Sequence, residues 1–71
     1  MSLFAKRLKE LRLDHSLTLK KIASLLNVSH VSYLRWEQGK TEPSSIAIIL
    51  ELCRILDVSA DYLLGNEDAL I

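Results

Sequence analysis

Residues 17–39 read LTLKKIASLLNVSHVSYLRWEQG and contain capping and turn residues around two apolar segments. Thr18 is a favourable N-cap for a first helix, which is expected to stop at Asn27, a residue type that tolerates the left-handed conformation of a tight turn. Ser29 can cap a second helix, and Gly39 is the residue type expected just past its end. The stretch therefore predicts two short helices in close succession.

Only Asn27-Val28-Ser29 connects these two helices. A turn that short, after a small Ala23 that allows close approach, predicts a helix-turn-helix, the motif whose second helix enters the major groove of DNA. This second helix is expected over 30–38, and Tyr33 and Trp36 are expected to face the protein. At about 100° per residue, the opposite face collects His30, Val31, Leu34 and Arg35.

Capping residues and apolar spacing predict three more helices around this pair. One runs from 3 to about 15, one opens at Ser44 or Ser45, and a short one lies between Ser59 and Gly65. The main core stripe of the fourth helix is expected to be Ile46, Ile49, Leu50, Cys53 and Leu56. Because no strand pattern competes, the predicted fold class is all-α, a compact five-helix bundle that forms one domain over 1–71.

The composition is that of a globular chain, with 49% hydrophobic and 25% charged residues. Charges appear too early for a signal peptide and no apolar run approaches ~18 residues, so a cytoplasmic protein without a membrane partner is expected. The lone Cys53 and two distant His predict neither a disulfide nor a metal site, and Cys53 is interpreted as a core residue or, alternatively, a redox-sensitive thiol. No catalytic constellation, cofactor motif or small-molecule ligand is evident, so an enzyme is not expected.

The charges are distributed unevenly although they sum to zero. Residues 1–40 hold eight Lys or Arg against three Asp or Glu, a net of +5, and residues 41–71 hold one Arg against six Asp or Glu, a net of −5. A basic half of this kind is a pointer to an anionic partner such as DNA. Solvated helix faces that balance by accident are the alternative.

Several segments in order resemble the phage-repressor (Cro/CI) or Xre-type helix-turn-helix family. They are Val28-Ser29, Arg35-Trp36-Glu37-Gln38-Gly39 and Val58-Ser59, within a likeness that extends from 7 to 65. The resemblance implies a lambda-repressor-like fold without a cofactor. It also implies a sequence-specific transcriptional regulator, in most members a homodimeric repressor that reads a near-palindromic operator in double-stranded DNA.

The resemblance places base contacts at the start of the second helix of the motif and one turn later: His30, Val31, Leu34 and Arg35. Arg35 suits a bidentate contact to guanine, and Val31 can pack on a thymine methyl group. A phosphate contact by Arg35, an idle exposed His30, and a protein-binding patch at Val31 and Leu34 are the alternatives. Contacts to the DNA backbone are expected from Lys20, Lys21, Ser32, Gln38 and Lys40.

Three other positions bear on this resemblance. The family often has a phosphate-binding Gln where this chain has Leu19, and often a base in the loop that here holds Glu42. Because leucine cannot donate a hydrogen bond, the first departure predicts a lower affinity for DNA per subunit. The second predicts repulsion from phosphate if Glu42 points at the DNA. The family also pairs an Arg of its first helix with the Glu that ends the recognition helix, which implies a partly buried ion pair between Arg12 and Glu37.

A second apolar row on the fourth helix must be buried somewhere. Either it fills the monomer core or, with the last residues, it forms a dimer interface that spaces two recognition helices ~34 Å apart. The candidate interface residues are Ile48, Leu52, Ile55, Tyr62, Leu63 and Leu70.

The alternative functions share this fold. One is a protein-interaction module that has lost DNA affinity, and another is an antitoxin-type partner protein or the DNA-reading part of a longer repressor. Salt dependence separates the first from DNA binding, because contacts to phosphate weaken steeply with salt.

Overall fold

Every helix in the described part of the chain begins at a Ser or Thr N-cap. The computed structural model describes residues 2–66 and contains α1 Leu3–Asp14, α2 Leu19–Leu26, α3 His30–Glu37, α4 Ile46–Leu56 and α5 Ala60–Leu64. The cap hydroxyl accepts a hydrogen bond of 3.0–3.1 Å from a backbone N–H two or three residues later. Each such bond satisfies one backbone donor at the helix start that has no partner within the helix. The caps are Ser2, Thr18, Ser29, Ser45 and Ser59.

The turn between α2 and α3 is set by Asn27 in the left-handed conformation, with φ 58°. Its N–H donates to the Ser24 carbonyl at 3.1 Å, and the Val28 N–H donates to the Ala23 carbonyl at 3.0 Å. These two hydrogen bonds end α2, and Ser29 follows at the position where it caps α3. Ala23 is 1% exposed, consistent with the close helix approach that its size allows.

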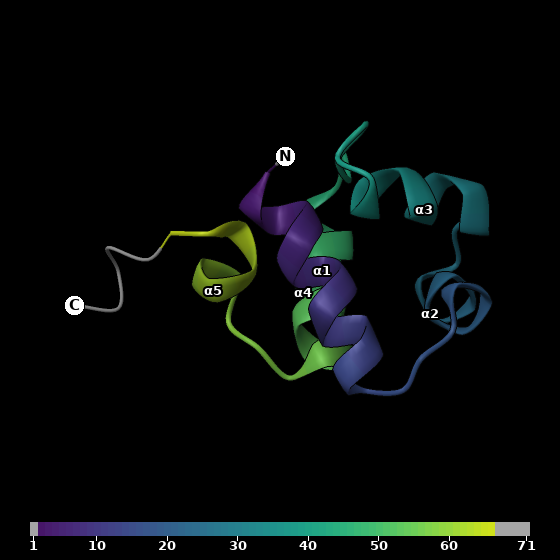
Figure 1. Ribbon diagram of the computed structural model, residues 1–71, viewed down its shortest axis with the longest axis horizontal. Helices are drawn as coiled ribbons and strands as arrows, with labels where there is room; N and C mark the ends of the chain where they lie inside the picture. The colour runs from purple at the N-terminus through teal and green to yellow at the C-terminus, as the bar shows by residue number, and fades with distance from the viewer. Residues whose placement is uncertain (1, 67–71) are drawn as a thin grey trace.

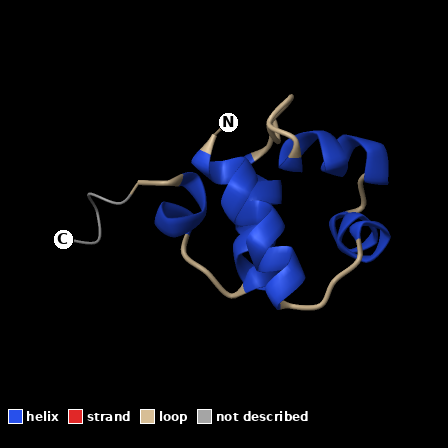
Figure 2. Cartoon of the chain, in the orientation of Figure 1, coloured by secondary structure: helices blue, strands red, loops and turns tan. Residues whose placement is uncertain are grey.

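Residues 2–66 form five helices and no strand, and short loops join the helices (Figure 2). In Figure 1, α1 and α4 occupy the centre, α2 and α3 lie at one end and α5 lies at the other. α1 packs against both α3 and α5. The predicted all-helical, lambda-repressor-like class is confirmed, although α3 ends one residue earlier than predicted and Ser45 rather than Ser44 caps α4. Within residues 2–66, no helix has both the length and the apolar character needed to cross a membrane.

One core joins all five helices. Its fully buried large side chains are Leu8, Ile22, Tyr33, Leu52, Leu56 and Leu63. The predicted core stripe of α4 is wrong in part, because Ile46 is 79% exposed and Leu50 is 60% exposed. α4 is apolar on almost every side, so its pattern alone does not select which face the other helices cover.

The predicted dimer interface is also wrong in part, for the same reason. Leu52 and Leu63 have no exposed surface and belong to the monomer core, so neither can contact a second copy. Ile48 and Ile55 are partly buried against that core. Tyr62 stays 37% exposed, and Leu70 lies outside the described residues.

Candidate nucleic-acid interface

The inner face of α3 is fixed by aromatic packing. Tyr33 is fully buried and Trp36 is 6% exposed, as predicted from their positions on the helix. Their ring centroids lie 5.7 Å apart with an interplanar angle of 66°, an edge-to-face arrangement. These two rings hold α3 on the core, so the opposite side of the helix faces outward.

Arg12 connects three segments at this inner face. Its Nε donates to Glu37 Oε2 at 2.6 Å and its Nη2 donates to Glu37 Oε1 at 3.2 Å, a bidentate pair. Its Nη1 donates to the Leu17 carbonyl at 2.8 Å. One guanidinium on α1 therefore holds both the end of α3 and the residue that precedes the N-cap of α2. The hydrogen bond to Glu37 raises the pKa of Arg12, so the guanidinium stays positively charged at every ordinary pH.

The ion pair expected from the sequence is thus present in the structure, and both side chains are buried, at 10% and 4% exposed for Arg12 and Glu37. The contact to Leu17 was not predicted. A backbone carbonyl has no residue-type signal, and its position follows from the turn at Ser16, which has φ 56°.

The Tyr33 hydroxyl lies buried without a hydrogen-bond partner among residues 2–66. Burial raises the pKa of Tyr33 far above its usual range, and the nearby carboxylate of Glu37 raises it further. The phenol is therefore neutral. Its hydroxyl is the one buried side-chain polar atom in residues 2–66 that lacks a hydrogen bond.

The outer face of α3 presents most of the expected base-contacting side chains. His30 and Arg35 are exposed and Val31 is 53% exposed, whereas Leu34 is only partly exposed. The first turn of α3 carries no acidic residue. The guanidinium of Arg35, the imidazole of His30 and the aliphatic side chain of Val31 have the chemistry needed to contact base edges in a major groove.

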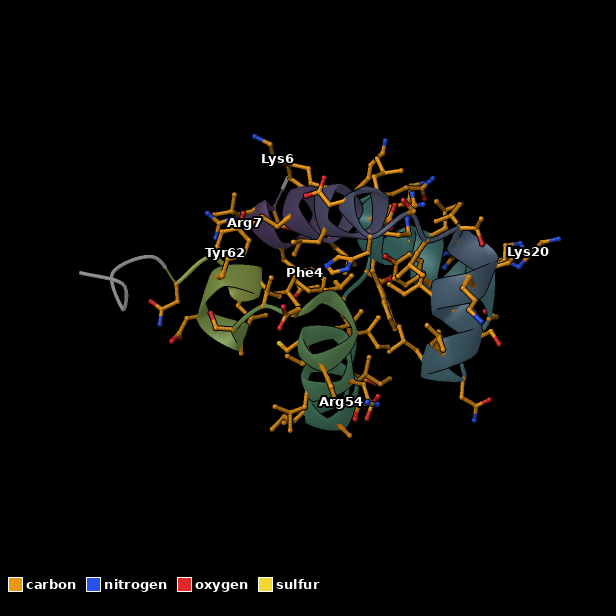
Figure 3. The ribbon with its side chains drawn as sticks, turned by 90° about the horizontal axis from the view of Figure 1, so that it is seen from below. Phe4, Lys6, Arg7, Lys20, Arg54 and Tyr62 are labelled. Atoms are coloured by element: carbon orange, nitrogen blue, oxygen red, sulfur yellow. The ribbon has the colours of Figure 1, made fainter. Side chains whose placement is uncertain are left out.

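Polar and basic side chains also lie in the first turn of α2 and just after α3. Lys20 and Lys21 lie in the first turn of α2, and Figure 3 shows Lys20 extending away from the rest of the molecule. Gln38 and Lys40 follow α3, and both are exposed. The fifth residue expected at the DNA backbone, Ser32, is exposed and its hydroxyl accepts a hydrogen bond from Ser29 Oγ at 2.9 Å.

Leu19 and Glu42 are the two positions that depart from the family pattern. Leu19 packs partly buried against the core, so this position contributes anchoring to α2 rather than a donor for phosphate. Glu42 is exposed in the loop after α3.

Arg35 differs from the other arginines in what it contacts. The Arg7 guanidinium stacks over the Tyr62 ring at 4.0 Å from its centroid and donates to the Tyr62 carbonyl at 2.5 Å (Figure 3). Arg54 pairs with Glu51 on α4. Arg35 makes no ion pair or side-chain hydrogen bond with any of the described residues, which leaves its donors available to a ligand.

The helix pair described above and the helices around it match a known family model. The model, described as helix-turn-helix, matches residues 8–63. The chain belongs to the helix-turn-helix family of the Xre, Cro and CI type. The family predicted from the sequence is thereby confirmed.

Helix-turn-helix relatives with similar sequences occur in Bacillus subtilis (strain 168). The HTH-type transcriptional regulator ImmR is 37% identical over 63 residues, which cover 89% of this chain and 49% of that protein. The uncharacterized HTH-type transcriptional regulator YobD is 33% identical over 66 residues, covering 93% and 58% respectively. For YqaE, another uncharacterized HTH-type transcriptional regulator, the identity is 37% over 65 residues, covering 92% and 55%. The chain thus spans about half the length of these relatives.

Proposed function

We propose that this chain is a cytoplasmic, sequence-specific DNA-binding transcriptional regulator that represses by occupying a near-palindromic operator as a homodimer. The outer face of α3 enters the major groove, where Arg35 contacts guanine, His30 contacts a base edge, and Val31 and Leu34 contact thymine methyl groups. Contacts to the phosphates come from Lys20, Lys21, Ser32, Gln38 and Lys40. The regulators named among its relatives support this assignment.

The observation that carries the proposal is the state of Arg35. It is exposed on the outer face of α3, has no ion pair or side-chain hydrogen bond among the described residues, and stands on a helix that two buried aromatic rings and the Arg12–Glu37 pair hold in place. Because α3 is held in place, only the Arg35 side chain loses freedom on binding, and its planar guanidinium can make a bidentate contact that contributes to sequence discrimination.

Selection of duplexes from a random pool, followed by fluorescence anisotropy of the recovered duplex, tests the proposal. We expect a preference for that duplex over a scrambled one, and an affinity that falls steeply as salt rises. Failure to enrich any sequence, together with no binding at low salt, would contradict it.

A protein-interaction module is the second candidate, because Val31 is an exposed aliphatic side chain on the outer face of α3 and Glu42 is an exposed acidic residue in the loop after α3. Binding through Val31 to a protein would change little with salt. The same titration, carried out against the recovered duplex, therefore separates the two functions.

A further inference from the structure

Two exposed aliphatic side chains lie in a row on α4. Ile46 is 79% exposed and Leu50 is 60% exposed, the two most exposed large hydrophobic side chains among residues 2–66. They are four residues apart, so they stand on one face of the helix, and Arg54 continues the row by another four residues. We call Ile46, Leu50 and Arg54 the α4 ridge.

The α4 ridge faces neither the core nor the predicted dimer interface. Figure 3 shows Arg54 on the side of α4 that faces away from α1, and Leu52 has no exposed surface on the core side. At about 100° per residue, Ile48 and Ile55 of the predicted interface lie about 140–160° around the helix from Leu50. The ridge is therefore accessible, and the proposed homodimer leaves it free.

Carboxylates lie near both ends of the ridge. Glu42 is exposed in the loop that leads into α4, and Asp57 is exposed where the helix ends. Neither carboxylate forms an ion pair with a described residue, whereas Arg54 is paired with Glu51. Residues 41–57 thus hold three carboxylates against one guanidinium, and the unpaired charges are negative.

This negative charge selects among the possible occupants of the ridge. It repels the phosphates of DNA and of an anionic membrane. A second copy is also disfavoured, because an antiparallel crossing of two α4 helices brings Glu42 of each chain toward Asp57 of the other, and a parallel crossing brings each carboxylate toward its own equivalent. The complementary surface is that of a different protein, apolar in the middle and basic at both ends.

The shape of the ridge suits a helix of about the same length. From Ile46 to Asp57 the rise is about 16 Å, or about three turns. Aliphatic residues four apart on a partner helix can pack between Ile46 and Leu50, as ridges pack into grooves. Lysine or arginine at the two ends of that helix then lies near Glu42 and Asp57.

We propose that the α4 ridge docks an amphipathic helix of a different protein, with aliphatic residues along one face and basic residues at both ends, and that it does so while α3 is bound to DNA. α3 packs against α1 and α2, and Figure 3 shows Arg54 and Lys20 on different sides of the molecule. The docked protein is therefore held beside the operator. Only this simultaneous binding rests on the proposed function.

A displayed library of helical peptides about three turns long tests the proposal. The peptides carry random residues on one face and either lysine or glutamate at each end. Peptides that bind Leu50→Asp are removed, and the remainder are selected on the wild type without DNA. We expect the enriched peptides to have aliphatic residues four apart and lysine at both ends. No enrichment, or enrichment of glutamate at the ends, would overturn the proposal.

Fluorescence anisotropy with one enriched peptide tests the apolar contact. Ile46→Asp should weaken binding by about tenfold or more, because a carboxylate loses its water against the aliphatic face of the peptide. The variant keeps its fold, since an acidic residue suits the first turn of a helix. The matched control is Leu13→Asp on α1, where the wild-type leucine is 56% exposed, and its binding should equal that of the wild type. Equal binding by Ile46→Asp and the wild type would overturn the proposal.

A charge exchange tests the contact at the end of the ridge. Glu42→Lys should bind the peptide more weakly than the wild type, and changing the nearer terminal lysine of the peptide to glutamate should restore binding. Glu10→Lys on α1 makes the same change of charge at an exposed position away from α4 and should have no effect. An equal loss in Glu10→Lys and Glu42→Lys, or no recovery, would overturn the assigned partner chemistry.

Sedimentation equilibrium of the protein alone tests for a second copy on the ridge. We expect Ile46→Asp and the wild type to have the same state of association. Self-association of the wild type that Ile46→Asp abolishes would assign the ridge to a second copy and overturn the proposal.

Titration of the peptide into the protein, free and bound to the recovered duplex, separates this inference from the proposed function. We expect the same affinity for the peptide in both states. Release of the peptide by the duplex would overturn simultaneous binding while DNA binding stands. If the protein binds no duplex, the proposed function fails, and the measurements without DNA still decide whether the ridge docks a basic helix.

Discussion

The inner and outer faces of the eight-residue helix α3 serve different purposes. On the inner face, Tyr33, Trp36 and Glu37 are buried, and every large change there alters how the helix sits on the core. On the outer face, His30 and Arg35 are exposed, so a change there leaves the fold intact. The residues that position this helix are therefore separable from those that face a ligand, and the following variants test that separation.

The largest effect is expected from Glu37→Ala on the inner face. Removing one partner of a buried ion pair leaves an uncompensated charge on Arg12, which costs about 3–5 kcal/mol of the free energy of unfolding. Thermal unfolding followed by circular dichroism should show the midpoint falling by more than about 10 °C. An unchanged midpoint would mean that the inner face does not depend on this pair.

Next in size is Arg35→Ala on the outer face. Loss of a bidentate base contact costs about 1–3 kcal/mol of binding free energy, which is roughly 5- to 150-fold in affinity for the selected duplex. The unfolding midpoint should stay where it is, because the side chain is exposed. Anisotropy and thermal unfolding of the same preparation measure both quantities. A lower midpoint with unchanged affinity would reverse the roles assigned to the two faces.

A smaller effect, restricted to alkaline solution, is expected from Tyr33→Phe. At neutral pH the variant should match the wild type within about 1 kcal/mol, because the hydroxyl that it removes has no partner. The phenol has a pKa near 10 in the unfolded chain and a higher one when folded. Unfolding therefore releases a proton above about pH 10, so wild-type stability falls as pH rises and that of the variant falls less.

Unfolding midpoints of both proteins, measured from about pH 8 to about pH 11, compare these slopes. Every other ionisable group is the same in both proteins, so the difference between the two slopes reports Tyr33. Parallel slopes would show that Tyr33 ionises in the folded state and is less buried than the structure has it.

The smallest change is expected from Lys20→Ala at the flank of the interface. A lysine that contacts phosphate contributes equally to every sequence, so affinity should fall for selected and scrambled duplexes alike. The slope of log affinity against log salt should decrease by about one unit. A loss confined to the selected duplex would indicate that Lys20 reads bases.

Sequence reasoning succeeded where a single residue type determines the local geometry. The hydroxyl caps at Thr18 and Ser29 and the left-handed Asn27 each act within a few residues, so the helix-turn-helix could be predicted before its packing was known. Tyr33 and Trp36 were placed correctly because they lie three residues apart on one face of α3 and are its two aromatic side chains.

The same reasoning failed on α4, where the pattern does not orient the helix. Ile46 and Leu50 were expected in the core and are exposed, whereas Leu52 was expected at an interface and is buried. Which side of α4 is covered depends on where α2 and α5 lie, and that is a property of tertiary packing. At the site, the Arg12 contact to the Leu17 carbonyl was equally inaccessible, because it depends on the turn after α1.

An NMR titration of the isotope-labelled protein with the selected duplex tests the separation of the two faces most directly. We expect the largest changes in backbone amide chemical shift at the start of α2 and over residues 29–35, which carry most of the outer face of α3. Amides of the core residues Leu56 and Leu63 should stay within a small fraction of those shifts. Saturable shifts that are largest on α4 and α5, with residues 29–35 unchanged, would contradict the account.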